Sequence, residues 1–302
     1  MTPCPICRSG GMTTELDTSM IRCSRCAECG HRVIAHKWVS RGSAGDYHLQ
    51  YDQDGFLPAL AATRKRQALL VLEALRRAGG TDRILDIGAG QGWFLETCRE
   101  AGVAMLAGVD GSSYAVGRLQ AQGIGSHLVD LRLLATPGEE KPLLGSAVGF
   151  PPAVVTLLDV LEHFDRQQPA AMLRRVLREF RDSLALVAVK VPVSRGLLFR
   201  ACLQMARLSA TGPFYQLLQV GLVPAHFHYF SVRSLRRLLH DCDLEIVEEI
   251  GDPDFEPNLM KSRVSALGRV PGFLVVPFAH ALRGIIRFLA VHDSWVVIAR
   301  PT

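Results

Sequence analysis

The sequence lacks the features that mark exported, membrane-spanning and dedicated nucleic-acid-binding proteins. Its first residues, Met-Thr-Pro-Cys, contain no apolar segment typical of a signal peptide. It has no uninterrupted apolar run of roughly eighteen residues, the length that would predict a transmembrane helix. The net charge of +5 is spread along the chain, without the dense run of lysine and arginine that nucleic-acid binders carry. We therefore expect a cytoplasmic protein.

The composition is that of a globular protein. Hydrophobic residues make up 48% of the 302 residues and charged residues 21%, which excludes wholesale disorder. A chain of this length can hold one full α/β domain and a small appendage.

Cysteines are concentrated at the start of the chain. Five of the eight precede residue 30, which fits a metal site in a reducing compartment better than a disulfide framework. Two C-x2-C pairs suit tetrahedral coordination of a structural zinc, and the predicted ligands are Cys4, Cys7, Cys26 and Cys29. Cys23 and Cys26 have the same spacing, but only the pair ending at Cys29 has a glycine directly after it. Five reduced cysteines without metal are the alternative.

A glycine-rich turn follows an apolar run in the segment ILDIGAGQGWFL, residues 84–95. The run contains Asp86, and Gly88, Gly90 and Gly92 then lead into a predicted helix. Such glycines let a ligand approach the backbone, and the start of a helix offers unpaired N–H groups. A dinucleotide fingerprint would need its third glycine where Trp93 stands, so the turn does not fit that cofactor class.

Three further apolar segments end on acidic residues, Asp110, Asp130 and Asp159. In this order, and behind the glycine-rich turn, they resemble the motifs of class I S-adenosylmethionine-dependent methyltransferases over roughly residues 60–302. The cysteine-rich segment resembles the zinc ribbon that precedes the catalytic domain in some bacterial methyltransferases. The resemblance implies S-adenosylmethionine as the cofactor. It also implies an α/β fold with a doubly wound, Rossmann-like sheet of seven strands, the last of them antiparallel.

The resemblance further implies how the cofactor is held. Gly88 and Gly90 would accept its methionine and ribose portions, Asp110 would bind the ribose hydroxyls, and Asp130 would bind the adenine amine. Asp86 would orient the turn. The full set of implied cofactor-binding positions is Asp86, Gly88, Ala89, Gly90, Gly92, Asp110, Gly111, Asp130, Leu131 and Asp159.

From residue 82 onward, short apolar runs alternate with helical patterns, which predicts parallel βαβ units. Leu69, Leu72 and Leu75 recur at helical spacing and predict a helix before the first of these units. A loop is expected over residues 132–150. Strands are expected near residues 83–87, 105–109, 126–129, 154–158, 185–191, 244–249 and 294–299.

These patterns divide the chain into a zinc-ribbon-like segment (1–45), a helical linker that covers the cofactor (46–80) and a methyltransferase domain (81–302). The domain carries two insertions, residues 193–225 and 251–293. In the first, an apolar face opposed by arginines is formed by Leu198, Ala201, Cys202, Met205 and Leu208. In the second, residues 270–291 show a similar face. These faces would pack on each other, pack on a second subunit of a homodimer, form an apolar acceptor pocket, or rest on a membrane surface.

Two histidines are candidate catalytic bases. His163 follows the strand expected at 154–158, beside the implied methyl position, and His226 precedes a predicted helix on the acceptor side. Packing or helix capping is the alternative role for His163. The other histidines that we considered belong to no recognisable group and are expected at the surface; these are His31, His36, His240 and His292.

The absence of one motif narrows the range of acceptor classes. Methyltransferases that act on amino groups of bases or glutamine often carry Asn/Asp-Pro-Pro-aromatic after the fourth strand, whereas residues 159–162 read Asp-Val-Leu-Glu. The sequence therefore favours methyl transfer to an oxygen of a small-molecule, glycan or lipid-like acceptor. An RNA methyltransferase that uses the basic ribbon for recognition, and a cofactor-binding scaffold without turnover, are the alternatives.

Overall fold

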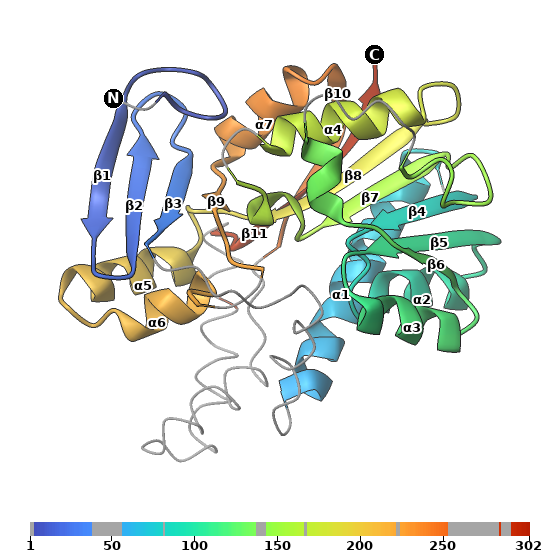
Figure 1. The fold of residues 1–302 in the computed structure, drawn as a ribbon, viewed down its shortest axis with the longest axis horizontal. Helices are drawn as coiled ribbons and strands as arrows, with labels where there is room; N and C mark the ends of the chain where they lie inside the picture. The colour runs from blue at the N-terminus through green and yellow to red at the C-terminus, as the bar shows by residue number, and fades with distance from the viewer. Residues whose placement is uncertain are drawn as a thin grey trace.

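A computed structural model describes residues 3–37, 56–80, 82–136, 143–165, 168–221, 224–252, 284 and 291–302. Two β-sheets organise these residues, a small one near the N-terminus and a large one that carries the helices of the α/β domain (Figure 1). Most of the second expected insertion, including nearly all of 270–291, lies outside the described residues.

The large sheet has seven strands in the order β10-β11-β8-β7-β4-β5-β6. The pairs among β8, β7, β4, β5 and β6 are parallel, and β11 runs antiparallel between β8 and β10. The fold class expected from the sequence is confirmed, including the antiparallel last strand. The strands are β4 (Arg83–Ile87), β5 (Met105–Asp110), β6 (Gly125–Leu128), β7 (Val154–Leu158), β8 (Leu186–Pro192), β10 (Leu244–Asp252) and β11 (Ser294–Pro301).

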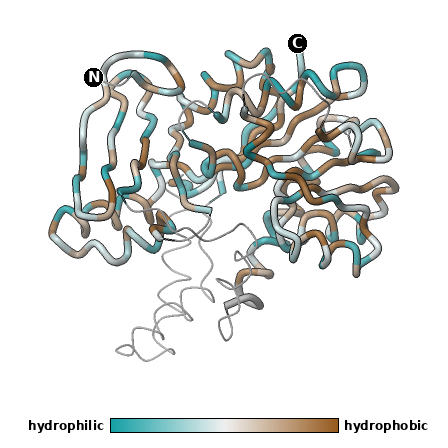
Figure 2. The backbone as a smooth tube through the Cα atoms, in the orientation of Figure 1, coloured by the Kyte–Doolittle hydropathy of each residue, from teal (hydrophilic) through white to brown (hydrophobic). Residues whose placement is uncertain are grey.

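Helices cover both faces of this sheet because its central strands are apolar on both sides. One buried cluster joins the sheet to α1 (Phe56–Arg77), α2 (Trp93–Glu100) and α3 (Ser113–Ala121). The other joins it to α4 (Gln168–Glu179) and α7 (Val232–His240). Figure 2 shows hydrophobic residues concentrated along the central strands. The expected loop over 132–150 begins as a 3₁₀ helix, η2 (Leu131–Ala135).

The small sheet combines the cysteine-rich segment with a strand from the α/β domain. Its order is β1 (Met12–Asp17), β2 (Ile21–Cys26), β3 (Arg32–His36) and β9 (His228–Tyr229). β9 pairs antiparallel with β3, so that Val33 lies opposite His228. The ribbon therefore shares its sheet with a segment almost two hundred residues further along the chain.

The first insertion packs against this small sheet, below it in Figure 1. It forms α5 (Leu197–Arg207) and α6 (Gly212–Leu217). The buried face of α5 is formed by Phe199, Cys202, Leu203 and Ala206. Within the expected apolar face, Cys202 is buried and Leu198 packs, partly buried, against the same cluster, whereas Ala201, Met205 and Leu208 are exposed. The ribbon covers this insertion, because the side chains of Ile21, Cys23 and Ile34 join the same buried cluster as Phe199 and Phe214.

Within the part of the chain that the structure describes, no helix combines the length and the apolar character needed to cross a membrane.

Phe214 should be a main support of the contact between the ribbon and the insertion. Its side chain is fully buried and meets Phe199 edge-on, with ring centroids 5.4 Å apart. We expect Phe214→Ala to lower the free energy of unfolding by about 3–5 kcal/mol, because it leaves a cavity in a packed cluster. Urea denaturation measures the change. Leu208→Ala, at a side chain 75% exposed, is the control and should change stability by less than about 0.5 kcal/mol.

Candidate functional site

The glycine-rich turn after β4 is shaped by positive backbone angles. Gly88 has φ +76° and Gly90 has φ +51°, a region that side chains disfavour. A Cβ on Gly88 would lie 2.6 Å from Cγ2 of Val160, so the turn packs closely there. A Cβ on Gly90 would meet only the Gly88 carbonyl oxygen, at 3.9 Å, and would otherwise project into open space. Gly90 is therefore where a ligand can reach bare backbone.

Two carboxyl groups hold this turn. Asp110, at the end of β5, accepts hydrogen bonds from the backbone N–H groups of Gly90 and Ser112, both at 2.8 Å. Asp86, within β4, accepts a hydrogen bond from the hydroxyl of Thr156 at 2.6 Å. Burial raises the pKa of Asp110, and burial raises the pKa of Asp86 to about 7. Asp86 thus links β4 to β7, whereas Asp110 fixes the backbone of the turn at Gly90.

A cavity opens beside the turn, and α1 forms one of its walls. Arg64 and Val71 of α1 face Gly88, Gly90 and other residues of the turn across it. Of the ten expected cofactor positions, the lining includes Asp86, Gly88, Ala89, Gly90 and Asp159. It does not include Gly92, Asp110, Gly111, Asp130 or Leu131. Asp110 still reaches the cavity wall through its bond to the Gly90 N–H.

Two of the positions outside the lining have other contacts. A Cβ on Gly92 would lie 2.5 Å from Leu119 Cδ2, so this glycine allows the close packing of α3. The Asp130 carboxylate accepts hydrogen bonds from the backbone and guanidinium of Arg132, and the bond to this guanidinium lowers the pKa of Asp130.

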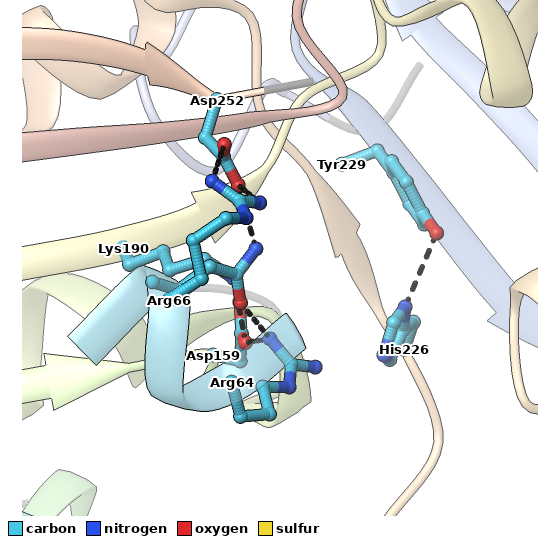
Figure 3. Close-up of polar contacts among 8 residues, drawn as sticks. Arg64, Arg66, Asp159, Lys190, His226, Tyr229 and Asp252 are labelled. Atoms are coloured by element: carbon cyan, nitrogen blue, oxygen red, sulfur yellow. Dashed lines mark hydrogen bonds and ion pairs between the residues drawn. The ribbon is translucent and has the colours of Figure 1, made fainter. Parts of the chain in front are cut away.

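Asp159, directly after β7, is part of the cavity lining together with Arg64 and Lys190, and Figure 3 shows the contacts among these three side chains. Lys190 Nζ donates to both carboxylate oxygens, at 2.7 and 2.8 Å, and Arg64 donates to Oδ2. Burial by itself raises the pKa of Asp159, but the positive charges of Arg64 and Lys190 outweigh it and hold this pKa well below its usual range. The Lys190 side chain is only 2% exposed, so water contributes little to compensating its charge and the pair with Asp159 matters more.

A second ion pair fastens α1 above the cavity. Arg66 donates to both oxygens of Asp252 on β10, at 2.7 and 3.0 Å, and Gln67 donates to the same carboxylate at 2.7 Å. Sequence reasoning missed these groups and the pair at Asp159. One sequence signal could have indicated a buried ion pair: Lys190 is the single charged residue within the apolar run of β8.

The two candidate catalytic histidines are brought together. His163 ends the 3₁₀ helix η3 (Leu161–His163) that follows β7, and His226 precedes β9. Their ring centroids lie 4.8 Å apart. Burial lowers the pKa of His163 and sets that of His226 well below its usual value. Both rings are therefore neutral at physiological pH.

Two histidines expected at the surface are instead part of the ribbon's contact with β9. His31 is fully buried, and its Nε2 lies 2.9 Å from Nδ1 of His228. Nε2 of His36 donates to the backbone oxygen of His226, at 2.8 Å. The expectation was wrong because the pairing of β9 with β3 covers this edge of the ribbon. His240 does lie at the surface, with a side chain 85% exposed.

The four predicted zinc ligands converge. Cys4, Cys7, Cys26 and Cys29 each place a sulfur within 4.8 Å of the other three. The backbone N–H of Cys29 points at the Cys26 sulfur, at 3.5 Å, as amides do toward thiolates in metal knuckles. Cys23 lies apart, in the apolar cluster with Phe199, and burial raises its pKa to about 12. The donor set and its arrangement fit a tetrahedral zinc site.

The sheet order and the glycine turn after β4 are those of the class I methyltransferase fold. A family model described as a methyltransferase domain matches residues 54–249, and the chain belongs to this family. No curated protein matches the chain in sequence.

Solved structures share the fold at low sequence identity. One is magnesium protoporphyrin IX methyltransferase from Synechocystis PCC 6803 with bound SAH, at 16% identity and a TM-score of 0.51, covering 85% of this chain and 94% of the other. Another is the cyclase SpnF, at 15% identity and a TM-score of 0.50, covering 87% and 98%. One of these is named a methyltransferase and the other a cyclase, so the fold alone does not identify the acceptor.

The buried charge of Lys190 should matter for stability. We expect Lys190→Met to lower the free energy of unfolding by about 3 kcal/mol, the lower end of the range for breaking a buried pair, because Arg64 still neutralises part of Asp159. Lys65→Met is the matched control: Lys65 is 43% exposed and pairs with Glu96, so the loss should stay below about 1 kcal/mol. Equal losses in the two variants, measured by urea denaturation, would contradict the assignment.

Proposed function

We propose that the protein transfers a methyl group from S-adenosylmethionine to an oxygen of a small-molecule, glycan or lipid-like acceptor. The observation that carries this proposal is the cavity beside Gly90, whose lining combines a cofactor-type turn with Asp159. Two neutral imidazoles lie near Asp159: burial lowers the pKa of both His163 and His226, and the charge of Asp159 opposes that shift only in part.

On the cofactor side, the backbone of Gly88, Ala89 and Gly90 would hold the methionine and ribose portions. Each carboxylate oxygen of Asp110 accepts one backbone N–H, which leaves lone pairs for the ribose hydroxyls, with Gly111 beside them. Asp86 keeps the turn in place through Thr156, and Gly92 seats the following helix. Asp130 and Leu131 remain the predicted contacts of the adenine.

On the acceptor side, His163 and His226 are the proposed catalytic residues. Bound S-adenosylmethionine supplies an activated methyl group. The acceptor oxygen bonds to the methyl carbon as the carbon–sulfur bond breaks, and a neutral imidazole can take the hydroxyl proton. Asp159 is fixed by Arg64 and Lys190, so we assign it to shaping the cavity and holding the cofactor rather than to proton transfer.

The ribbon offers little support for RNA recognition. Arg22 and Lys37 pair with Asp17, and Arg32 pairs with Glu15, so two carboxylates offset part of the charge of these three basic side chains. We therefore propose no second function. Membrane contact through 270–291 and a homodimer remain predictions.

We also propose that the ribbon binds one structural zinc through Cys4, Cys7, Cys26 and Cys29. Cys7→Ser should remove one equivalent of zinc per chain, because it removes one of four thiolate ligands. Elemental analysis of protein prepared without chelators measures this. Cys23→Ser is the control and should keep its zinc. A loss of zinc in the Cys23 variant but not in the Cys7 variant would overturn the ligand set.

Asp110→Ala should weaken binding of S-adenosylmethionine by several-fold to about a hundred-fold, since charge-assisted hydrogen bonds contribute about 1.5–3 kcal/mol. Calorimetry measures the affinity. Asp182→Ala, at an exposed position in the turn between α4 and β8, should bind as the unchanged protein does. Unchanged affinity in the Asp110 variant would contradict the ribose assignment.

The acceptor class is tested by methyl transfer from labelled S-adenosylmethionine to separated pools of small molecules, lipids, glycans and RNA, with the Asp110 variant as the blank. We expect base-stable label in the small-molecule, lipid or glycan pool. Label only in RNA, or in no pool, would overturn the proposal.

A further inference from the structure

Three side chains on the acceptor side form a group that has the composition of a metal site. Glu162, His163 and His226 each place one ligand atom within 4.8 Å of those of the other two. Glu162 and His163 come from η3, and His226 comes from the segment before β9. The group is separate from the cysteine cluster of the ribbon.

The hydrogen bonds of the two rings determine which nitrogens hold protons. Nδ1 of His163 lies 2.9 Å from the backbone oxygen of Ala225, which can only accept, so this Nδ1 carries the proton. The Tyr229 hydroxyl donates to the Leu217 oxygen at 3.1 Å, so Nδ1 of His226, at 3.3 Å, donates to the Tyr229 oxygen. In both neutral rings, Nε2 therefore keeps a lone pair. This is the arrangement that metal-binding histidines usually have.

Glu162 is the third group, and its environment is unusual. Its side chain is only 1% exposed, and Oε2 is buried without a hydrogen-bond partner among the described residues. A buried carboxyl oxygen without a partner is costly, and a bound cation removes that cost. The nearby negative charge of Asp159 adds to this cost, and Arg64 and Lys190 offset it only in part because their hydrogen bonds go to Asp159.

The backbone holds the three residues together before any ligand arrives. The backbone N–H of Phe227 donates to the backbone oxygen of Glu162 at 2.7 Å, and this bond joins η3 to the His226 segment. His36 of the ribbon donates to the His226 oxygen at 2.8 Å. The group is therefore fixed from both sides, as a metal site requires.

We propose that Glu162, His163 and His226 bind one divalent cation of the zinc or iron(II) type through a carboxylate oxygen and the two Nε2 atoms. Two imidazoles and one carboxylate suit such ions and leave coordination positions open. An acceptor oxygen that binds there loses its proton to solvent water more easily, because the cation stabilises the oxyanion. This inference rests on the proposed function. In the enzyme with its cation bound, loss of the acceptor proton to water at the cation replaces proton uptake by the imidazoles.

The first test counts zinc in the full chain after equilibration with zinc and removal of loosely bound ion by desalting. We expect two equivalents per chain in the unchanged protein and one in Glu162→Gln and in His226→Gln. The matched controls Glu245→Gln and His240→Gln, at exposed positions, should keep two. Unchanged calorimetric binding of S-adenosylmethionine in each variant shows that the fold is intact.

A second measurement separates a metal site from a merely structural group. Tyr229→Phe removes the hydroxyl that orients His226 and should weaken the second zinc by about ten- to a hundred-fold, measured by competition with a chelating dye. One zinc in the unchanged protein, or two in Glu162→Gln, would overturn the inference. If protein that holds one zinc transfers methyl groups at full rate, the inferred second site is wrong and the proposed function is retained. Two zinc ions without methyl transfer to any pool would overturn the proposed function and leave the site.

Discussion

The pairing of β9 with β3 is the contact on which the acceptor side depends. Through it, a strand of the α/β domain becomes the fourth strand of the ribbon, and His31 and His228 are buried against each other. The same junction determines where α7 begins, because the Ser231 hydroxyl caps that helix and also donates to the Cys29 oxygen. A zinc ion in the cysteine cluster would therefore stabilise more than the ribbon. It would hold the segment that carries His226.

The cofactor side depends on buried charge. Arg64 and Arg66 lie two residues apart on α1 and pair with Asp159 and Asp252, which belong to different parts of the large sheet. These pairs orient the helix over the cavity more specifically than its leucines can, because an ion pair requires particular partners whereas apolar packing tolerates exchange. Lys190 pairs with the same Asp159 from β8, a strand that is otherwise apolar.

The two sides meet at the end of β7. There Asp159 has a positive φ of 58°, and the chain turns directly into η3 with Glu162 and His163. Four residues thus carry the chain from the cofactor cavity to the acceptor side. Aspartate tolerates this left-handed conformation better than most residues, and Arg64 and Lys190 hold it in place. This short connection explains how a fold shared with proteins of other activities can present its own acceptor groups.

The sequence by itself determined the parts of this protein that depend on local pattern. The strands of the large sheet, the glycine turn after β4 and the two cysteine pairs follow from periodicity and short spacing, and the structure places them as expected. Only the tertiary structure decided which distant residues meet. His31 and His228 are 197 positions apart, and Arg64 and Asp159 are 95 apart. No local pattern encodes such pairs, because they arise when β9 joins the ribbon and α1 closes over the sheet. For the same reason, His31 and His36 were misplaced at the surface, and the buried face of α5 was set by contact with the ribbon rather than by its own hydrophobic pattern.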